Sequence, residues 1–451
     1  MENRCRFLVR ILTGIRAAVG SNFVVGARIN GDDFVEGGND LAACAEIAKY
    51  LEPYVDYFNV SCGVYASAPT MIEPCYSAEG WRKHLAQTIK AAVNVPIIAV
   101  NTIKHAETAE RFLQEGVSDF VGMSRMHIAD PDLVKKTMAG REDLIRHCLG
   151  CMNCNKSVVS GKNLHCAINP VSGRATVYGD DKLVKNGDGR TVVVVGGGPG
   201  GMQAALLLKK RGYAPVILEA SNHLGGSAVL ASKAPCKGMV AEFIDTMKAE
   251  MLEYGIDVRL NTPGTVETIK ALNPYGVVVA CGGLQIVPNI PGSDNDHVYS
   301  IEDVLLKKVQ FENKNIAVIG GGHVGLEVAH FLCENNKVTV VEMQKEVGVT
   351  IYRTAKFKLL SLLEESGVEI LTEHSIAGVS EDSITMKKMD TGETVTRPAE
   401  IVVMALGNRP DQAYAEELKA AFDKIVFVGD ANKAGTMADA TLSAYENCWF
   451  F

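Results

Sequence analysis

Four cysteines near the middle of the chain, Cys148, Cys151, Cys154 and Cys166, have the residue type and spacing of a metal-binding site. Two spacers of two residues let the first three sulfurs converge from one tight loop, and a spacer of eleven residues brings back the fourth. Iron–sulfur sites with four cysteines are built in this way. Zinc is the alternative metal, but zinc sites usually contain two CxxC pairs or cysteine with histidine. The three-plus-one grouping therefore favours one [4Fe–4S] cluster.

The same cysteines could instead be buried thiols or the disulfides of a secreted protein. The N-terminal residues do not resemble a signal peptide, and the other eight cysteines are scattered through apolar and loop segments. Scattered thiols are typical of a reducing compartment, so we expect a cytoplasmic protein.

Two glycine-rich segments each follow an apolar strand and begin a helix. The first contains Gly196, Gly198 and Gly201, and the next strand ends at Glu219, twenty-three residues after Gly196. In a dinucleotide site such glycines allow a tight turn and close approach of the pyrophosphate, and the acid accepts hydrogen bonds from ribose. A lone GxGxxG would be weak evidence, but here the strand, the helix and the acid are all present.

The whole arrangement recurs at Gly320, Gly322 and Gly325, with Glu342 twenty-two residues after Gly320. If the glycines only made turns, the occurrence of two complete sets of strand, glycine loop, helix and acid would be unexplained. A carboxylate at the ribose accepts a hydrogen bond from the 2′-hydroxyl and repels a 2′-phosphate. Because the two residues after Glu342 supply no arginine, the second site favours NADH over NADPH.

The first 145 residues alternate apolar strands with amphipathic helices, which predicts a parallel sheet covered on both sides. We expect helices at about 1–20, 39–52, 78–93 and 105–115, and strands at about 23–29, 56–61, 96–100 and 119–123. Four βα units are half of what a (β/α)8 barrel needs. We therefore expect the C-terminal half of such a barrel, cut at its N-terminus, and the apolar Trp-Phe-Phe end suggests a second cut.

Polar side chains stand at the C-terminal ends of these strands, where barrels place their sites: Arg28, Ser61, Asn101 and Arg125. The set favours one anionic ligand. The loops at Asn101 and at Gly122 to Arg125 match the phosphate site that barrels build after strands 7 and 8. Any one of these arginines alone could equally be an ion-pair partner.

These motifs resemble the old-yellow-enzyme relatives that carry an iron–sulfur cluster, namely the 2,4-dienoyl-CoA reductases, 2-enoate reductases and bile-acid-type NADH:flavin oxidoreductases. The resemblance rests on residues 2–7, the strand ending in Arg28, residues 121–125 with 129–131, and the cysteines, and it extends over the whole chain. It implies that FMN contacts Arg28, Asn101, Gly122 and Arg125. It also implies a catalytic tyrosine and histidine in the first half of the barrel, which is absent here, so we name no catalytic residue.

The sequence departs from that family in two places. The family usually has glycine at positions like Asn101 and Ser124, where backbone amides approach the FMN phosphate. It also usually has three residues where Cys151 and Cys154 are separated by two. We therefore expect the FMN phosphate loops to be less well matched than the cluster.

The residues from about 185 onward resemble the two-dinucleotide flavoproteins related to disulfide reductases. In those proteins the first site holds FAD and the inserted second site holds NAD(P)H. The resemblance implies further FAD contacts at Gly226, Gly282, Gly429 and Asp430, with Asp430 at the ribityl chain. No CxxC pair accompanies this region, so thiol–disulfide reduction is not expected.

The fold class is therefore α/β, in four parts. These are a partial TIM barrel at 1–145, an iron–sulfur segment and linker at 146–185, an FAD-binding domain at 186–300 and 395–451, and an inserted NAD(H)-binding domain at 301–394. A net charge of −8 argues against a nucleic-acid surface, and no apolar run reaches the roughly 20 residues that span a bilayer. The expected partner is a small-molecule alkene, and a homo-oligomer is left open.

The predicted function is an NADH-dependent flavin oxidoreductase that reduces an activated C=C bond of an enoate or of an enoyl or dienoyl thioester. Electrons would pass from NADH to FAD, then singly through the cluster to FMN, because two flavins in separate domains cannot exchange hydride directly. Two alternatives stay open: an NADH diaphorase that passes electrons to a partner protein without reducing an alkene, and a redox sensor with a labile cluster. The sequence does not name the alkene.

Overall fold

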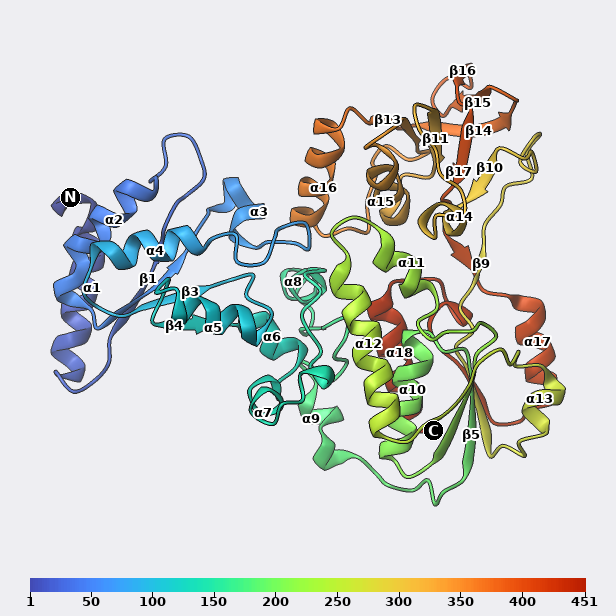
Figure 1. Ribbon diagram of the computed structural model, residues 1–451, viewed down its shortest axis with the longest axis horizontal. Helices are drawn as coiled ribbons and strands as arrows, with labels where there is room; N and C mark the ends of the chain where they lie inside the picture. The colour runs from blue at the N-terminus through green and yellow to red at the C-terminus, as the bar shows by residue number, and fades with distance from the viewer. The chain divides into compact units, whose positions relative to one another are not determined.

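The computed structural model describes residues 1–451, which form two compact units, Met1–Thr137 and Met138–Phe451 (Figure 1). Both units are built on parallel sheets with helical connections, so the α/β class is confirmed. No helix combines the length and the apolar character needed to cross a bilayer.

The first unit contains a four-stranded parallel sheet in the order β1-β2-β3-β4, as the alternation predicts. Its strands are β1 Gly26–Asn30, β2 Tyr57–Ser61, β3 Ile97–Val100 and β4 Phe120–Gly122. Its helices are α1 Glu2–Val19, α2 Leu41–Leu51, α3 Ala68–Met71, α4 Lys83–Ala92, α5 Ala106–Gln114 and α6 Ser124–Ala129, and α7 Leu133–Met138 follows. Because the strands end at one edge of the sheet, the loops after β1, β2, β3 and β4 can form one site.

Helices cover one face of this sheet, which corrects the prediction of two covered faces. The inward residues of β1 to β3, such as Ile29, Phe58 and Ile97, pack in one core with α1, α2, α4 and α5. On the opposite face Arg28 and Phe120 are exposed. The continuous apolar strands predicted a sheet buried on both faces, yet no layer of helices covers the second face. Helices on one face of a parallel sheet are the arrangement of a barrel wall.

The second unit begins with the cysteine segment, which contains α8 Asn153–Val159 and α9 Ala175–Tyr178. The first dinucleotide fold follows, as a parallel sheet in the order β19-β8-β5-β6-β7. The strands are β5 Thr191–Val195, β6 Ala214–Leu218, β7 Asp257–Arg259, β8 Gly276–Val279 and β19 Ile425–Phe427. The helices are α10 Pro199–Lys210, α11 Ser227–Lys233, α12 Gly238–Glu253, α13 Val266–Lys270, α17 Gln412–Ala421 and α18 Met437–Trp449. Figure 1 shows α10 and α12 on one side of this sheet and α13 and α17 on the other.

The second dinucleotide fold is inserted between β8 and β19, and the short strands β9 Leu284–Gln285 and β18 Asn408–Arg409 pair at the crossing points. Its parallel sheet has the order β10-β17-β11-β12-β13. The strands are β10 Val298–Ser300, β11 Asn315–Ile319, β12 Lys337–Val341, β13 Glu369–Leu371 and β17 Ile401–Met404, and the helices are α14 Ile301–Leu305, α15 His323–Leu332 and α16 Arg353–Glu365. An antiparallel sheet of β14 His374–Val379, β15 Ser383–Lys388 and β16 Thr394–Pro398 completes it. Because β10 and β17 belong to this sheet, we propose an insertion wider than 301–394.

The apolar residues at the C-terminus pack into the first dinucleotide fold. Trp449 and Phe451 are buried, and the Phe451 ring lies edge-on to Tyr213. The hydroxyl of Tyr213 also donates to the Phe451 carbonyl at 3.1 Å. Internal packing therefore accounts for the apolar character of these residues.

Candidate functional site

The first glycine-rich loop joins β5 to α10 in a conformation that requires glycine. Gly196 has φ +103°, in the left-handed region, and a Cβ at Gly201 would lie 1.9 Å from the Gly196 carbonyl oxygen. Beside Gly198 the nearest atom to an added Cβ is the Gly226 Cα, at 3.9 Å. The N-terminus of α10 is therefore open at Gly198, where a pyrophosphate could accept hydrogen bonds from backbone amides.

Glu219 is fixed beside this loop by the backbone. Its Oε2 accepts a hydrogen bond from the Gly197 N–H at 2.7 Å, and its Oε1 accepts one from the Ser221 N–H at 2.8 Å. Each carboxylate oxygen keeps further acceptor capacity for a ribose hydroxyl. The acid expected from the sequence therefore stands at the loop, already oriented.

The second loop repeats this geometry in the inserted fold. A Cβ at Gly325 would lie 1.9 Å from the Gly320 carbonyl oxygen, and nothing lies within 4 Å of a Cβ at Gly322. Glu342 accepts hydrogen bonds from the N–H groups of Gly321 and Gln344, both at 2.8 Å. The two sites predicted from the sequence are thus the same structure built twice.

The other glycines expected at the first site share left-handed backbone. Gly226, Gly282 and Gly429 have φ of +50°, +79° and +59°. Gly226 lies against the first loop, since its added Cβ would be 3.1 Å from the Gly198 Cα. Asp430 lies in the short helical turn Gly429–Ala431, and its Oδ1 accepts a hydrogen bond from the Gly435 N–H at 3.0 Å. Their roles toward FAD stay predictions.

A buried ion pair that we did not predict links the two dinucleotide folds. The Lys237 ammonium, just before α12, lies 2.6 Å from the Glu327 carboxylate on α15. His323, in the first turn of α15 after the second glycine loop, places its Nε2 2.9 Å from the same oxygen. Burial acts to raise the pKa of Glu327, but the His323 hydrogen bond and the Lys237 charge lower it to about 2. The carboxylate therefore stays ionised between the two loops.

Replacing Glu327 with glutamine should destabilise the second unit by about 3 kcal/mol at neutral pH, because it removes the negative charge that faces the Lys237 ammonium in a largely buried ion pair. A pKa lowered from 4.5 to about 2 means that the stabilisation is present above pH 4.5 and is lost as the pH falls toward 2. Urea unfolding of both proteins should therefore show a difference that shrinks below about pH 4. Glu334→Gln, an exposed substitution just after α15, is the control. A difference independent of pH would contradict the ionised pair.

The four cysteines lie within electrostatic reach of one another, and none of the chain's cysteines is in a disulfide. Burial raises the pKa of Cys166 to about 12, although a hydrogen bond from the Ile168 N–H acts to lower it. The atoms packed around its sulfur also raise the pKa of Cys151, although the residue is exposed, and that sulfur receives a hydrogen bond from the Asn153 N–H. Backbone N–H groups that donate to the sulfurs of Cys151 and Cys166 fit a site in which a metal cluster stabilises the thiolates.

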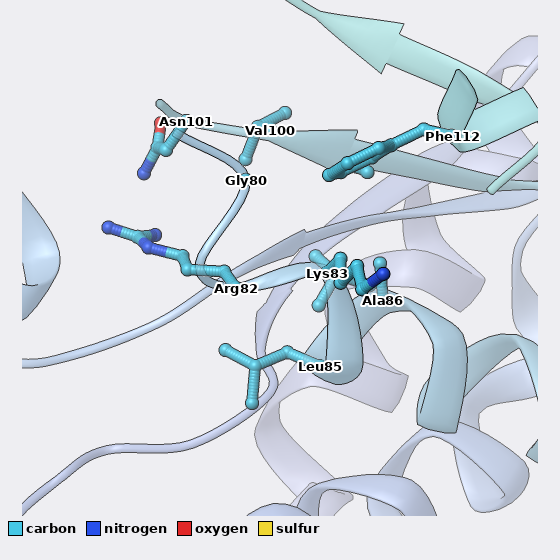
Figure 2. Close-up of a pocket in the computed structure, with 10 residues that line it drawn as sticks. Gly80, Arg82, Lys83, Leu85, Ala86, Val100, Asn101 and Phe112 are labelled. Carbon is cyan, nitrogen blue, oxygen red and sulfur yellow. The ribbon is translucent and has the colours of Figure 1, made fainter. Parts of the chain in front are cut away.

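The loops after β3 and β4 are joined by a buried carboxylate that we did not predict. Glu73 is 1% exposed and forms an ion pair with Arg82. The Arg125 guanidinium donates to the Glu73 carbonyl at 2.7 Å, and its second nitrogen lies 3.4 Å from the carboxylate. With its amide rotated by a half-turn, which exchanges its oxygen and nitrogen, Asn101 accepts a hydrogen bond from the Arg82 guanidinium at 2.7 Å. Figure 2 shows the Arg82 guanidinium pointing toward Asn101 across a small pocket.

The structure thus brings Asn101 and Arg125 together through Glu73 and Arg82. Arg28 makes its own contact, a hydrogen bond from Nη2 to the Ser61 hydroxyl at 2.9 Å. Asn101 has φ +72°, the left-handed conformation that favours glycine. A Cβ at Gly122 would lie 2.8 Å from a Val100 methyl, so packing alone accounts for that glycine. FMN contact at these four positions stays a prediction.

Family models match both units. The model described as NADH:flavin oxidoreductase / NADH oxidase family matches residues 1–143, and that of pyridine nucleotide-disulphide oxidoreductase matches residues 190–432. The NADH oxidase of Thermoanaerobacter brockii is 37% identical over 99% of this chain and 70% of its own length. The chain belongs to the old-yellow-enzyme-like NADH:flavin oxidoreductase family. The resemblance noted from the motifs is confirmed, and the chain is an oxidoreductase.

Other members of this family have reductase names. The cinnamate reductase of Clostridium sporogenes is 28% identical over 99% of this chain and 69% of its own length. A solved structure of 2-naphthoyl-CoA reductase with 2-naphthoyl-CoA is 31% identical and covers 99% of this chain and 68% of its own, with a TM-score of 0.92. The fold predicted from the sequence, a barrel segment followed by two dinucleotide folds, is therefore the fold of this family. Family membership also supports flavin and nicotinamide cofactors.

Proposed function

We propose that this flavin oxidoreductase transfers electrons from NADH to an activated C=C bond of an enoate or of an enoyl or dienoyl thioester. The observation that carries the proposal is the presence, in one unit, of two dinucleotide loops with backbone-fixed glutamates and four grouped thiols. Relatives named cinnamate reductase and 2-naphthoyl-CoA reductase support the substrate class. The net reaction takes NADH, one proton and the alkene to NAD⁺ and the saturated product.

Each group of residues would hold one cofactor. The loop at Gly196 to Gly201 with Glu219 would bind FAD, the loop at Gly320 to Gly325 with Glu342 would bind NADH, and the strand ends of the first unit would bind FMN. When bound, these groups would supply hydride acceptance, single-electron transfer through a [4Fe–4S] cluster, and hydride delivery to the alkene. The chain's own part is to orient them through the fixed glutamates and the cysteine loops.

An NADH diaphorase that reduces a partner protein is a second candidate, and one observation favours it. The sheet of the first unit has free edges at β1 and β4, and Arg28 and Phe120 on its second face are exposed. An FMN site on such a face would lack the side-chain layers that fill a closed barrel. The first unit could then fail to reduce alkenes while the second still oxidised NADH.

Two assays test the proposal. NADH oxidation with an artificial dye as the electron acceptor distinguishes the alkene reductase and the diaphorase from a redox sensor, because a sensor needs no catalytic turnover. Reduction of cinnamate or of an enoyl thioester by NADH, measured on the chain joined to four further βα units that close its barrel, then separates the alkene reductase from the diaphorase. A purified chain with FAD that fails to reduce the dye would contradict both enzyme readings.

Replacing Glu342 with glutamine should reduce the preference for NADH over NADPH by about tenfold, since one charge repulsion near the surface is worth about 1 kcal/mol or more. The reason is that the carboxylate repels a 2′-phosphate, whereas the amide does not. The measurement is the ratio of kcat/KM for the two nucleotides in dye reduction. Glu219→Gln, the same change in the first loop, should affect FAD content and leave the ratio unchanged. Wild-type protein that used both nucleotides equally would disprove the role of Glu342.

A further inference from the structure

A single arginine lies at the centre of a largely buried hydrogen-bond network beside the cysteine segment. Arg146 precedes Cys148 by two residues, and its side chain is only 12% exposed. Its Nη1 donates to the Ile168 carbonyl at 2.6 Å and to the Gln203 amide oxygen at 3.0 Å. Its Nε and Nη2 donate to the two Glu250 carboxylate oxygens at 3.0 and 2.5 Å. The guanidinium therefore makes a two-point ion pair and two further hydrogen bonds.

One of these partners lies at the far end of the cysteine segment and the other two lie on helices. Ile168 follows Cys166 by two residues, so Arg146 connects the backbone beside the first cysteine to that beside the fourth. Gln203 is 5% exposed and lies on α10, two residues after Gly201. Glu250 lies on α12. One side chain thus joins the cysteine loops to the helix that begins at the first dinucleotide loop.

Two buried threonines hold the same backbone. The Thr246 hydroxyl on α12 donates to the Ile145 carbonyl at 3.2 Å, and the Thr441 hydroxyl on α18 donates to the Ala167 carbonyl at 2.8 Å. Both side chains are buried, at 6% and 0% exposed. The residues next to the outer cysteines are therefore anchored on α10, α12 and α18, all elements of the first dinucleotide fold.

We propose that Arg146 is a positioning residue that locks the cysteine segment onto the first dinucleotide fold and sets the stability and reduction potential of the bound cluster. This inference rests on the proposed function, which places FAD and the cluster at these two sites. Charge-assisted, two-point hydrogen bonds from arginine fix geometry more tightly than neutral bonds. Outer partners of metal ligands affect metal affinity, and nearby charge affects the potential of a cluster.

The test compares Arg146→Gln, Glu250→Gln and the double substitution in the full chain, assembled anaerobically. Iron release to a chelator should be about ten to a hundred times faster in Arg146→Gln, the range found for outer partners of metal ligands. The midpoint potential, followed by EPR, should fall in Arg146→Gln, which loses a positive charge, and rise in Glu250→Gln, which loses a negative one. The double substitution should keep the potential near that of wild type and still release iron faster. If Arg146→Gln does not fold, the double and Glu250→Gln proteins carry the test.

Arg141→Gln is the matched control, because Arg141 pairs with Glu253 on the same helix α12 but lies on the surface. It should change neither iron release nor potential. Equal effects in Arg141→Gln, or unchanged iron release and potential in the Arg146 and Glu250 variants, would overturn the inference. Potentials that moved in the same direction in both single variants would also overturn it. The two substitutions remove opposite charges, so an electrostatic effect must shift the potential in opposite directions, whereas a purely structural effect need not. Wild-type protein without iron or FAD would instead overturn the proposed function.

Discussion

Replacing Cys151 with alanine should abolish the iron–sulfur cluster while leaving FAD bound. Wild-type protein purified without oxygen should contain about four iron and four sulfide per chain, and the variant should contain almost none. The reason is that Cys151 lies close to the other three cysteines of the group, and its sulfur accepts a hydrogen bond from the Asn153 N–H. The glycine loop and Glu219 are built from separate residues, so the FAD content should not change. Iron, sulfide and FAD analysis of the same sample measures all three.

Cys236→Ala is the control, since Cys236 is an exposed cysteine outside the group. It should retain full iron and sulfide. Four iron atoms in Cys151→Ala would show that this thiol is not a ligand. Zinc in place of iron in the wild-type protein would contradict the choice of metal, because zinc was the alternative that the cysteine spacing left open.

The parts of the fold that could be predicted from the sequence are those specified by neighbouring residues. The four strands and the helices α1, α2, α4 and α5 of the first unit follow from local apolar patterns, whereas the short helices α3, α6 and α7 were not predicted. Both dinucleotide loops follow from glycines that the backbone requires. Gly201 and Gly325 pack within contact of the carbonyls of Gly196 and Gly320, where no side chain fits. Because that constraint acts over a few residues, it is visible in a short motif.

What could not be predicted depends on partners far apart in the chain. Arg146 and Glu250 are 104 residues apart, and Arg125 and Glu73 are 52 apart, so no local pattern pairs them. One buried charge did have a local signal in the sequence. Glu327 is a charged residue on an otherwise apolar face of α15, and that position could have indicated a buried ion pair. The absence of helices from the second face of the first sheet was not predicted. The reason is that β3 is apolar at every position, and a strand with this sequence is expected both in a sheet covered on one face and in a sheet covered on two.

Purified as these 451 residues, the chain should bind FAD in equimolar amount, reduce dyes with NADH, hold far less than one FMN and fail to reduce enoates. The free edges at β1 and β4 leave the first sheet open, and Arg28 and Phe120 on its second face are exposed. A phosphate at the strand ends would also have to compete with Glu73, which already binds Arg125. The second unit carries its own cores and both glycine loops, so it should remain competent.

Flavins released by heat and separated by chromatography measure the two occupancies, and dye and enoate assays on the same preparation measure the two activities. Dye reduction is the internal control, because it shows that NADH and FAD are in working order when enoate reduction is absent. Joining the chain to four further βα units that close the barrel should restore both FMN and alkene reduction, since closure pairs both free edges and covers the Arg28 face. Equimolar FMN in the 451-residue chain, or enoate reduction by it, would contradict this prediction. Either result would show that the four-stranded sheet suffices as a flavin site. It would also mean that Arg125 can leave Glu73 and bind the phosphate without a closed barrel.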